Sequence, residues 1–150
     1  QRTVAIAKPD VIVMLDEVVL AEEHAKVVSA RFFPDHRDGA SQIDIDRVAK
    51  AFVIARPNAA LHVSVAGSGV SLEKDQLDLP DELGAFPYLE AQSTNPTTRF
   101  ELLTVMQVVP KDVSPDEILL EQTEGGWQVS GRRGVISLAR DGDDMSVAYA

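Results

Sequence analysis

The sequence predicts an antiparallel all-β sandwich. Short apolar runs alternate with polar residues at a period of two, which is the spacing of a half-buried strand. Turn-forming Gly, Pro, Asn and Asp residues separate these runs at intervals of about 8–12 residues, and no strand–helix–strand alternation occurs. We therefore expect about ten short strands in two packed layers, as an open sandwich in preference to a closed barrel, although the sequence alone does not decide between those two.

The first part of the chain is typical of a strand, a turn and a second strand. Residues 3–8 form the first apolar run, and Pro9-Asp10 supplies the turn. Residues 11–15 are apolar on both faces, which indicates a strand covered on both sides. We expect Asp16-Glu17 to end this strand.

Residues 18–33 give conflicting signals. The segment 21–26 has helical propensity, with Glu22 and Lys26 placed as an i,i+4 pair. The β-favouring residues that follow run into Pro34-Asp35, a break in regular structure. We expect a loop followed by a strand here, and a further loop over residues 34–39.

The middle of the chain predicts short strands around Ile43 and Ile45, over 48–55 and over 61–66. Residues 73–97 are the least regular part, with charged and proline-containing segments, and are expected to form a long loop.

The longest strand signal covers residues 99–109 and is stopped by Pro110. Even-numbered apolar residues lie on one of its faces and odd-numbered ones on the other. A strand is expected over 117–122, and three more, over 126–130, 134–139 and 145–150, are expected to form a meander.

The composition indicates one globular domain over residues 1–150. Acidic residues number 24 against 14 basic ones, a formal net charge of -10, which disfavours nucleic acid and anionic lipid as partners. No cysteine is present, so disulfides, thiolate metal sites and cysteine nucleophiles are excluded. No run of about 18 apolar residues occurs, so we expect no membrane span. Because the chain opens without Met or a leader, we expect it to be a segment of a larger protein.

The N-terminal third resembles a known family. Arg2-Thr3-Val4, followed by Lys8-Pro9-Asp10 and the apolar run into Asp16-Glu17-Val18, resembles the opening of the β-sandwich domain of heparinase II/III-like polysaccharide lyases. His24 stands where that family has a histidine before its next long strand. The run Arg99-Phe100-Glu101-Leu102-Leu103-Thr104-Val105-Met106, ending at Pro110, is similar to another strand of the family. The resemblance spans residues 2–110 in order, and 117–150 match the closing strands loosely.

This resemblance implies a C-terminal β-sandwich module of a lyase that cleaves uronic-acid-containing polysaccharides by β-elimination. It implies an N-terminal α/α toroid domain in the same chain, which carries most of the catalytic groups, and an acidic polysaccharide as the substrate of the full enzyme. The module would then have a structural and cleft-wall role and be inactive alone, in a periplasmic or secreted protein. A free-standing carbohydrate-binding or scaffolding sandwich is the alternative.

Some members of that family hold a structural zinc in the β-domain through His and Asp. Asp16 matches the family's Asp, but Arg31-Phe32-Phe33 occupies the place of the expected histidine, and His36 falls a few residues later. A further ligand would lie upstream of residue 1. Asp16 and His36 are the candidate metal ligands, and an Asp16 that bonds to backbone N–H groups of a turn is the structural alternative.

No residue is assigned a catalytic or cofactor-binding role. Tyr88 is of the type that acts as the base in such eliminations, but a tyrosine beside Phe and Pro is more often a packing residue. Trp127 is expected to pack on a neighbouring strand in preference to a sugar. The acidic runs 35–39, 44–46 and 141–144 do not match a calcium loop.

Overall fold

The computed structural model describes residues 1–7, 10–80, 84–142 and 144–150, and this part of the chain is built almost entirely from β-strands. Pro9 of the expected first turn, Asp81 and Glu82 of the expected long loop, and Asp143 lie outside the described residues. The described strands are β1 (Arg2–Ala7), β2 (Val11–Val19), β3 (Ser29–Phe32), β4 (Gln42–Asp46), β5 (Ala51–Ala55), β6 (Ala59–Ala66), β7 (Val70–Leu77), β8 (Phe86–Ser93), β9 (Arg99–Pro110), β10 (Ile118–Thr123), β11 (Gly126–Gly131), β12 (Gly134–Asp141) and β13 (Asp144–Tyr149).

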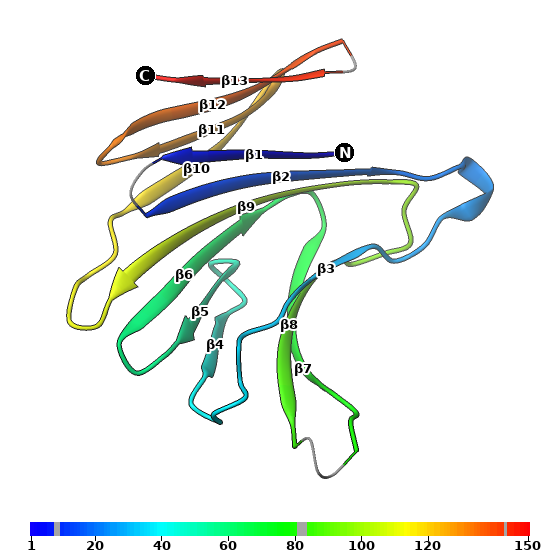
Figure 1. Ribbon diagram of the computed structural model, residues 1–150. Coiled ribbons are helices and arrows are strands. Elements are labelled where there is room, and N and C mark those ends of the chain that lie inside the picture. Colours follow the sequence, from blue (N-terminus) through cyan, green and yellow to red (C-terminus); the bar gives the residue numbers. More distant parts are fainter. Residues whose placement is uncertain (8–9, 81–83, 143) are drawn as a thin grey trace.

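These strands form three antiparallel sheets (Figure 1). A six-stranded sheet has the order β1-β2-β9-β6-β5-β4, a four-stranded sheet β10-β11-β12-β13 and a three-stranded sheet β3-β8-β7. One short 3₁₀-helix, η1 (Glu22–His24), precedes β3. The antiparallel all-β sandwich is confirmed, and the structure has a third sheet in addition to the two layers that the sequence predicts. Within the described ranges, no helix is long and apolar enough to span a bilayer.

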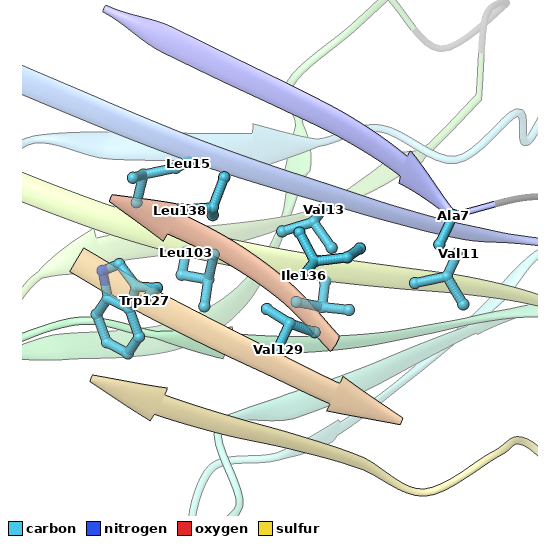
Figure 2. Close-up of a cluster of buried hydrophobic side chains, with 10 residues drawn as sticks. Ala7, Val11, Val13, Leu15, Leu103, Trp127, Val129, Ile136 and Leu138 are labelled. Atoms are coloured by element: carbon cyan, nitrogen blue, oxygen red, sulfur yellow. The ribbon is translucent and has the colours of Figure 1, made fainter. Parts of the chain in front are cut away.

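One hydrophobic cluster joins the four-stranded sheet to the six-stranded sheet. Figure 2 shows its side chains pointing toward one another from β1, β2 and β9 on one side and from β11 and β12 on the other. The odd-numbered residues of β2 and the even-numbered residues of β12 enter it, as expected for a period of two. Its buried members are Ala7, Val11, Val13, Leu15, Leu103, Val105, Trp127, Val129, Ile136 and Leu138.

A second cluster joins the three-stranded sheet to the opposite face of the six-stranded sheet. Leu89 and Ala91 of β8 contribute to it, together with side chains of β5, β6 and β7. Phe100 and Leu102 of β9 also belong to it, whereas Leu103 and Val105 of the same strand belong to the first cluster. Strand β9 therefore serves both cores, which explains why its sequence is apolar on both faces.

The prediction of a long loop over residues 73–97 is wrong for most of that range, because the end of β7 and all of β8 lie within it. Glu73, Lys74 and Asp75 are exposed because β7 is an edge strand. Odd-numbered residues of β8 direct their backbone groups toward β3, as the bond from the Ser93 N–H to the Val28 carbonyl shows (2.9 Å). The pairing of β8 with β3 ends at Leu89, which lies opposite Phe32. Pro87 lies past the end of β3, so its missing N–H costs no hydrogen bond between the two strands.

Two expected strand boundaries also differ. β2 does not stop at Asp16-Glu17 but continues to Val19, because its pairing with β9 extends to Val19 and Arg99. Both carboxylates have an arginine partner: Arg2 of β1 pairs with Asp16, and Arg140 of the facing sheet pairs with Glu17. The strand expected from residue 48 begins only at Ala51. The preceding residues form a turn, in which the Asp46 carboxylate accepts hydrogen bonds from the N–H groups of residues 48 and 49 (3.0 and 2.9 Å).

Strand β1 forms an open edge of the six-stranded sheet. Gln1 and Glu17 exchange both of their backbone hydrogen bonds (2.8 and 2.9 Å). In β1, the N–H and C=O groups of the odd-numbered residues therefore point toward β2. The N–H and C=O groups of residues 2, 4 and 6 therefore point away from the sheet. Val4 and Ile6 are also 51% and 64% exposed, so this edge is apolar as well as unpaired.

Candidate functional site

The outer face of the three-stranded sheet carries a group of interacting polar and aromatic side chains. Leu89 and Ala91 of β8 point inward to the core, so Tyr88 and Glu90 point outward. Cross-strand neighbours place Asp75 of β7 opposite Tyr88, and Arg31 of β3 opposite Glu90. We call these four residues, with Phe33, the Tyr88 cluster.

Hydrogen bonds fix the polar members of the Tyr88 cluster. The Arg31 Nε donates to Glu90 Oε1 at 2.8 Å, and its guanidinium carbon lies 5.1 Å from the centroid of the Tyr88 ring. The Tyr88 hydroxyl donates to Asp75 Oδ2 at 3.2 Å. The phenol is thus held between a cation on its face and a carboxylate at its hydroxyl.

Aromatic rings extend the cluster toward the loop after β3. The Phe33 ring lies 5.3 Å from the Tyr88 ring and is itself 53% exposed. Farther along β8, the Phe86 ring meets the His36 imidazole edge-on at 6.3 Å. Phe33 therefore offers an open apolar surface beside hydrogen-bonding groups, an arrangement that suits a sugar ring or another protein surface.

The electrostatics of the cluster keep Tyr88 protonated. Burial and the hydrogen bond to Asp75 raise the pKa of Tyr88, because both disfavour the phenolate. A hydrogen bond from Ser29 and the bond to Arg31 lower the pKa of Glu90. At neutral pH the cluster therefore holds a neutral phenol, which is only 7% exposed, beside an ionised carboxylate.

The two candidate metal ligands are bound to other side chains. Asp16 accepts two hydrogen bonds from Arg2, at 2.5 and 2.9 Å, in place of the turn N–H bonds of the structural alternative. The His36 Nδ1 lies 2.5 Å from the Ser41 hydroxyl oxygen. In the part of the chain that the structure describes, no group of three or more His, Asp and Glu side chains suits a metal. The described residues therefore do not fit a zinc site by themselves.

Arginines hold the carboxylates of the first acidic run considered for calcium. Asp35 pairs with Arg37, and Asp38 pairs with Arg56 through two bonds of 2.7 Å; these bonds lower the pKa of both carboxyls. Asp141 and Asp144 face each other across the β12–β13 turn.

Trp127 packs on neighbouring strands, as the sequence predicts. It is only 5% exposed and belongs to the first core cluster, and its Nε1–H donates to Glu101 Oε1 at 2.7 Å. The indole face is therefore not open to a sugar. Tyr149 lies in β13, which corresponds to the strand expected over residues 145–150.

The sequence interpretation considered Tyr88 but missed its partners Arg31, Phe33, Asp75 and Glu90. The signal for them was the alternation of Phe86, Tyr88 and Glu90, which Pro87 and the charged run in β7 obscured. No protein-family model matches this chain, and no curated protein matches it either.

Proposed function

We propose that this chain is the C-terminal β-sandwich module of a heparinase II/III-like polysaccharide lyase. In this proposal it packs beside an N-terminal α/α toroid and lines one wall of the cleft, in a periplasmic or secreted enzyme that acts on uronic-acid-containing polymers. The ordered resemblance over residues 2–110 and the all-β fold support this assignment.

The observation that carries the cleft-wall role is the Tyr88 cluster. An exposed Phe33 ring stands beside a fixed arginine, phenol and carboxylate, which is the chemistry of a surface that contacts a sugar chain. Tyr88 is only 7% exposed and its hydroxyl is already bound to Asp75, so we assign it no role as the base of β-elimination. The module is therefore assigned contact with the polysaccharide, and the elimination itself is assigned to the toroid domain.

A comparison of the chain with its full gene product tests the proposal. Both are incubated with heparin, hyaluronan and alginate, and formation of the unsaturated uronate is followed by ultraviolet absorbance. We expect product from the full gene product and none from residues 1–150 alone. Turnover by the isolated chain, or a gene that encodes no helical domain, would refute the proposal.

A substitution in the full gene product tests the contact role. Phe33→Ala removes exposed apolar surface, so it is expected to raise KM about threefold to tenfold while leaving kcat unchanged. Val48→Ala is the matched control, because Val48 is an almost fully exposed residue of the β4–β5 turn. Equal KM values for the two variants would argue against sugar contact at Phe33.

A free-standing carbohydrate-binding module is the second candidate, and the exposed Phe33 ring is also the feature that favours it. It predicts measurable affinity of the isolated chain for a neutral glycan, lost in Phe33→Ala. Calorimetry with neutral oligosaccharides distinguishes the two, because the lyase assignment does not require such affinity.

A further inference from the structure

A pocket lies at one end of the sandwich, outside the Tyr88 cluster. The β11–β12 turn and the segment between β9 and β10 are found at the same end of the molecule (Figure 1). Together with the end of β9 and with Asp10, which precedes β2, they line a pocket of about 410 Å³. This volume lies in the range of small-molecule sites. Its lining includes Arg132 and Arg133 from the turn, Asp10, Asp116, and the apolar side chains of Pro110 and Val113.

The two arginines of this turn differ in what holds them. The Arg133 Nη2 donates to Asp10 Oδ2 at 3.2 Å, and its Nε lies 3.2 Å from Asp10 Oδ1 and 4.0 Å from Asp116. The Arg132 side chain is 85% exposed, and its nearest carboxylate oxygen, on Asp116, is 3.9 Å away. Among the described residues, Arg132 donates no side-chain hydrogen bond. Arg133 thus anchors the turn, and the guanidinium of Arg132 is left for an external group.

Most other arginines of the chain are already committed to a carboxylate. Arg2, Arg31, Arg37, Arg47, Arg56 and Arg140 each donate at least one hydrogen bond to Asp or Glu. Arg132 therefore differs from these six in being both accessible and weakly paired; Arg99 is also exposed, but it does not line the pocket. A guanidinium in this state binds a carboxylate through two parallel hydrogen bonds.

The rest of the pocket matches the remainder of a sugar acid. The Asp116 carboxylate provides acceptors for hydroxyl groups. The backbone of Asp116 is held in place because its N–H donates to Oε1 of the buried Gln107 at 3.0 Å. The exposed Val113 side chain and Pro110 provide an apolar wall for the C–H face of a pyranose ring. A cation, acceptors for hydroxyl groups and an apolar wall thus occur in one pocket.

We propose that this pocket binds a uronic acid residue, with its carboxylate on Arg132 and a hydroxyl on Asp116. The choice of ligand rests on the proposed function, whereas the site rests on the pocket itself. Since the chain carries a net charge of -10, the affinity is weak and depends on the local arginine pair.

The test is an amide NMR titration of residues 1–150 with tetrasaccharides of galacturonic, mannuronic and glucuronic acid. Galactotetraose is the neutral control, and acetate is the control for a carboxylate alone. We expect saturable shifts at the amides of 131–134 with at least one uronate tetrasaccharide and with neither control. No binding, or equal binding of acetate or the neutral sugar, would overturn the proposal.

Variants locate the contact. Arg132→Ala is expected to weaken binding about tenfold, and Arg132→Lys to weaken it less, because lysine keeps the charge but loses the paired donors. Arg99→Ala is the control, since Arg99 is an exposed arginine at the start of β9 and away from this turn. Arg132→Ala with unchanged affinity and an unchanged amide spectrum elsewhere would place the ligand in another site.

The two proposals fail separately. A gene product that is an active lyase but shows no uronate binding at Arg132 would overturn only the pocket assignment. Binding at Arg132 in a gene product without a toroid domain would overturn only the lyase assignment.

Discussion

Among the glycines of the described residues, Gly126 is the one at which an added Cβ would lie nearest to another backbone atom. It begins β11, and a Cβ there would collide with the Leu138 carbonyl oxygen of β12, whereas a Cβ on the adjacent Gly125 would meet nothing within 4 Å. The conflict is with backbone, so a side-chain rotation cannot relieve it. The Gly-Gly pair that marks the turn in the sequence thus contains one required glycine and one that is free to change.

We expect Gly126→Ala to lower the free energy of unfolding by about 2 kcal/mol or more, because β11 and β12 must move apart. Gly125→Ala should change it by less than about 0.5 kcal/mol. Urea denaturation of the two variants measures the difference. Equal stabilities would show that the two strands can separate at little cost.

Glu90 makes stability depend on pH in a direction set by its partners. Its pKa in the folded state lies below the ordinary 4.5, because Ser29 and Arg31 bond to the ionised form. The ionised carboxylate therefore stabilises the fold above that ordinary value, and the contribution is lost as the pH falls through the folded-state pKa.

Glu90→Gln is accordingly expected to lose less stability than the parent when the pH falls from about 7 to about 3. The measurement is the free energy of unfolding across that range. Glu121→Gln, at an exposed position on β10, serves as the control and should follow the parent. A parallel pH dependence in Glu90→Gln and the parent would refute the assignment.

Strand β9 is the element on which both cores depend. It pairs with β2 on one side and β6 on the other, and consecutive residues enter opposite clusters. Leu102 is fully buried, whereas Leu119 on β10 is 62% exposed. The two leucines therefore report the difference between a central and an edge strand.

Leu102→Ala is expected to destabilise the chain by about 2–5 kcal/mol, through lost burial and the cavity left behind. Leu119→Ala should cost less than about 1 kcal/mol, since its side chain is already largely in water. Thermal or urea denaturation of the two variants and the parent measures these changes in stability. A small effect of Leu102→Ala would mean that the second cluster collapses around the missing atoms.

The sequence predicts the elements whose faces alternate cleanly and misses those in which charge or proline interrupts the pattern. β9 and the C-terminal meander are confirmed because apolar residues recur there at a period of two. β7 and β8 were hidden because an exposed edge strand tolerates charges and because Pro87 needs no partner at its position. For the same reason the sequence identified Tyr88 as a candidate but not Asp75 or Arg31, which reach it only through strand pairing.

The whole molecule is expected to unfold as one unit, because β9 links the two clusters. Trp127 is the only tryptophan and lies in the first cluster, so its fluorescence follows that core alone. Far-ultraviolet circular dichroism follows all three sheets.

We expect the two signals to give the same urea midpoint, as in a two-state transition. Leu102→Ala, in the second cluster, should shift the Trp127 fluorescence midpoint together with the dichroism midpoint. A fluorescence transition that stays in place while the dichroism changes would show that the sheets unfold independently.

The outward-facing backbone groups of β1 also affect how the chain behaves at high concentration. Peptide groups of residues 2, 4 and 6 lie beside the exposed Val4 and Ile6, and such a border is a template on which strands of other molecules add and grow into aggregates. The like charge carried by every copy opposes this growth, and salt weakens that opposition. Concentrated solutions of the chain should therefore stay clear longest at low ionic strength. Val4→Lys should extend that range, because it replaces an apolar side chain on the exposed edge with a charged one that disfavours strand addition.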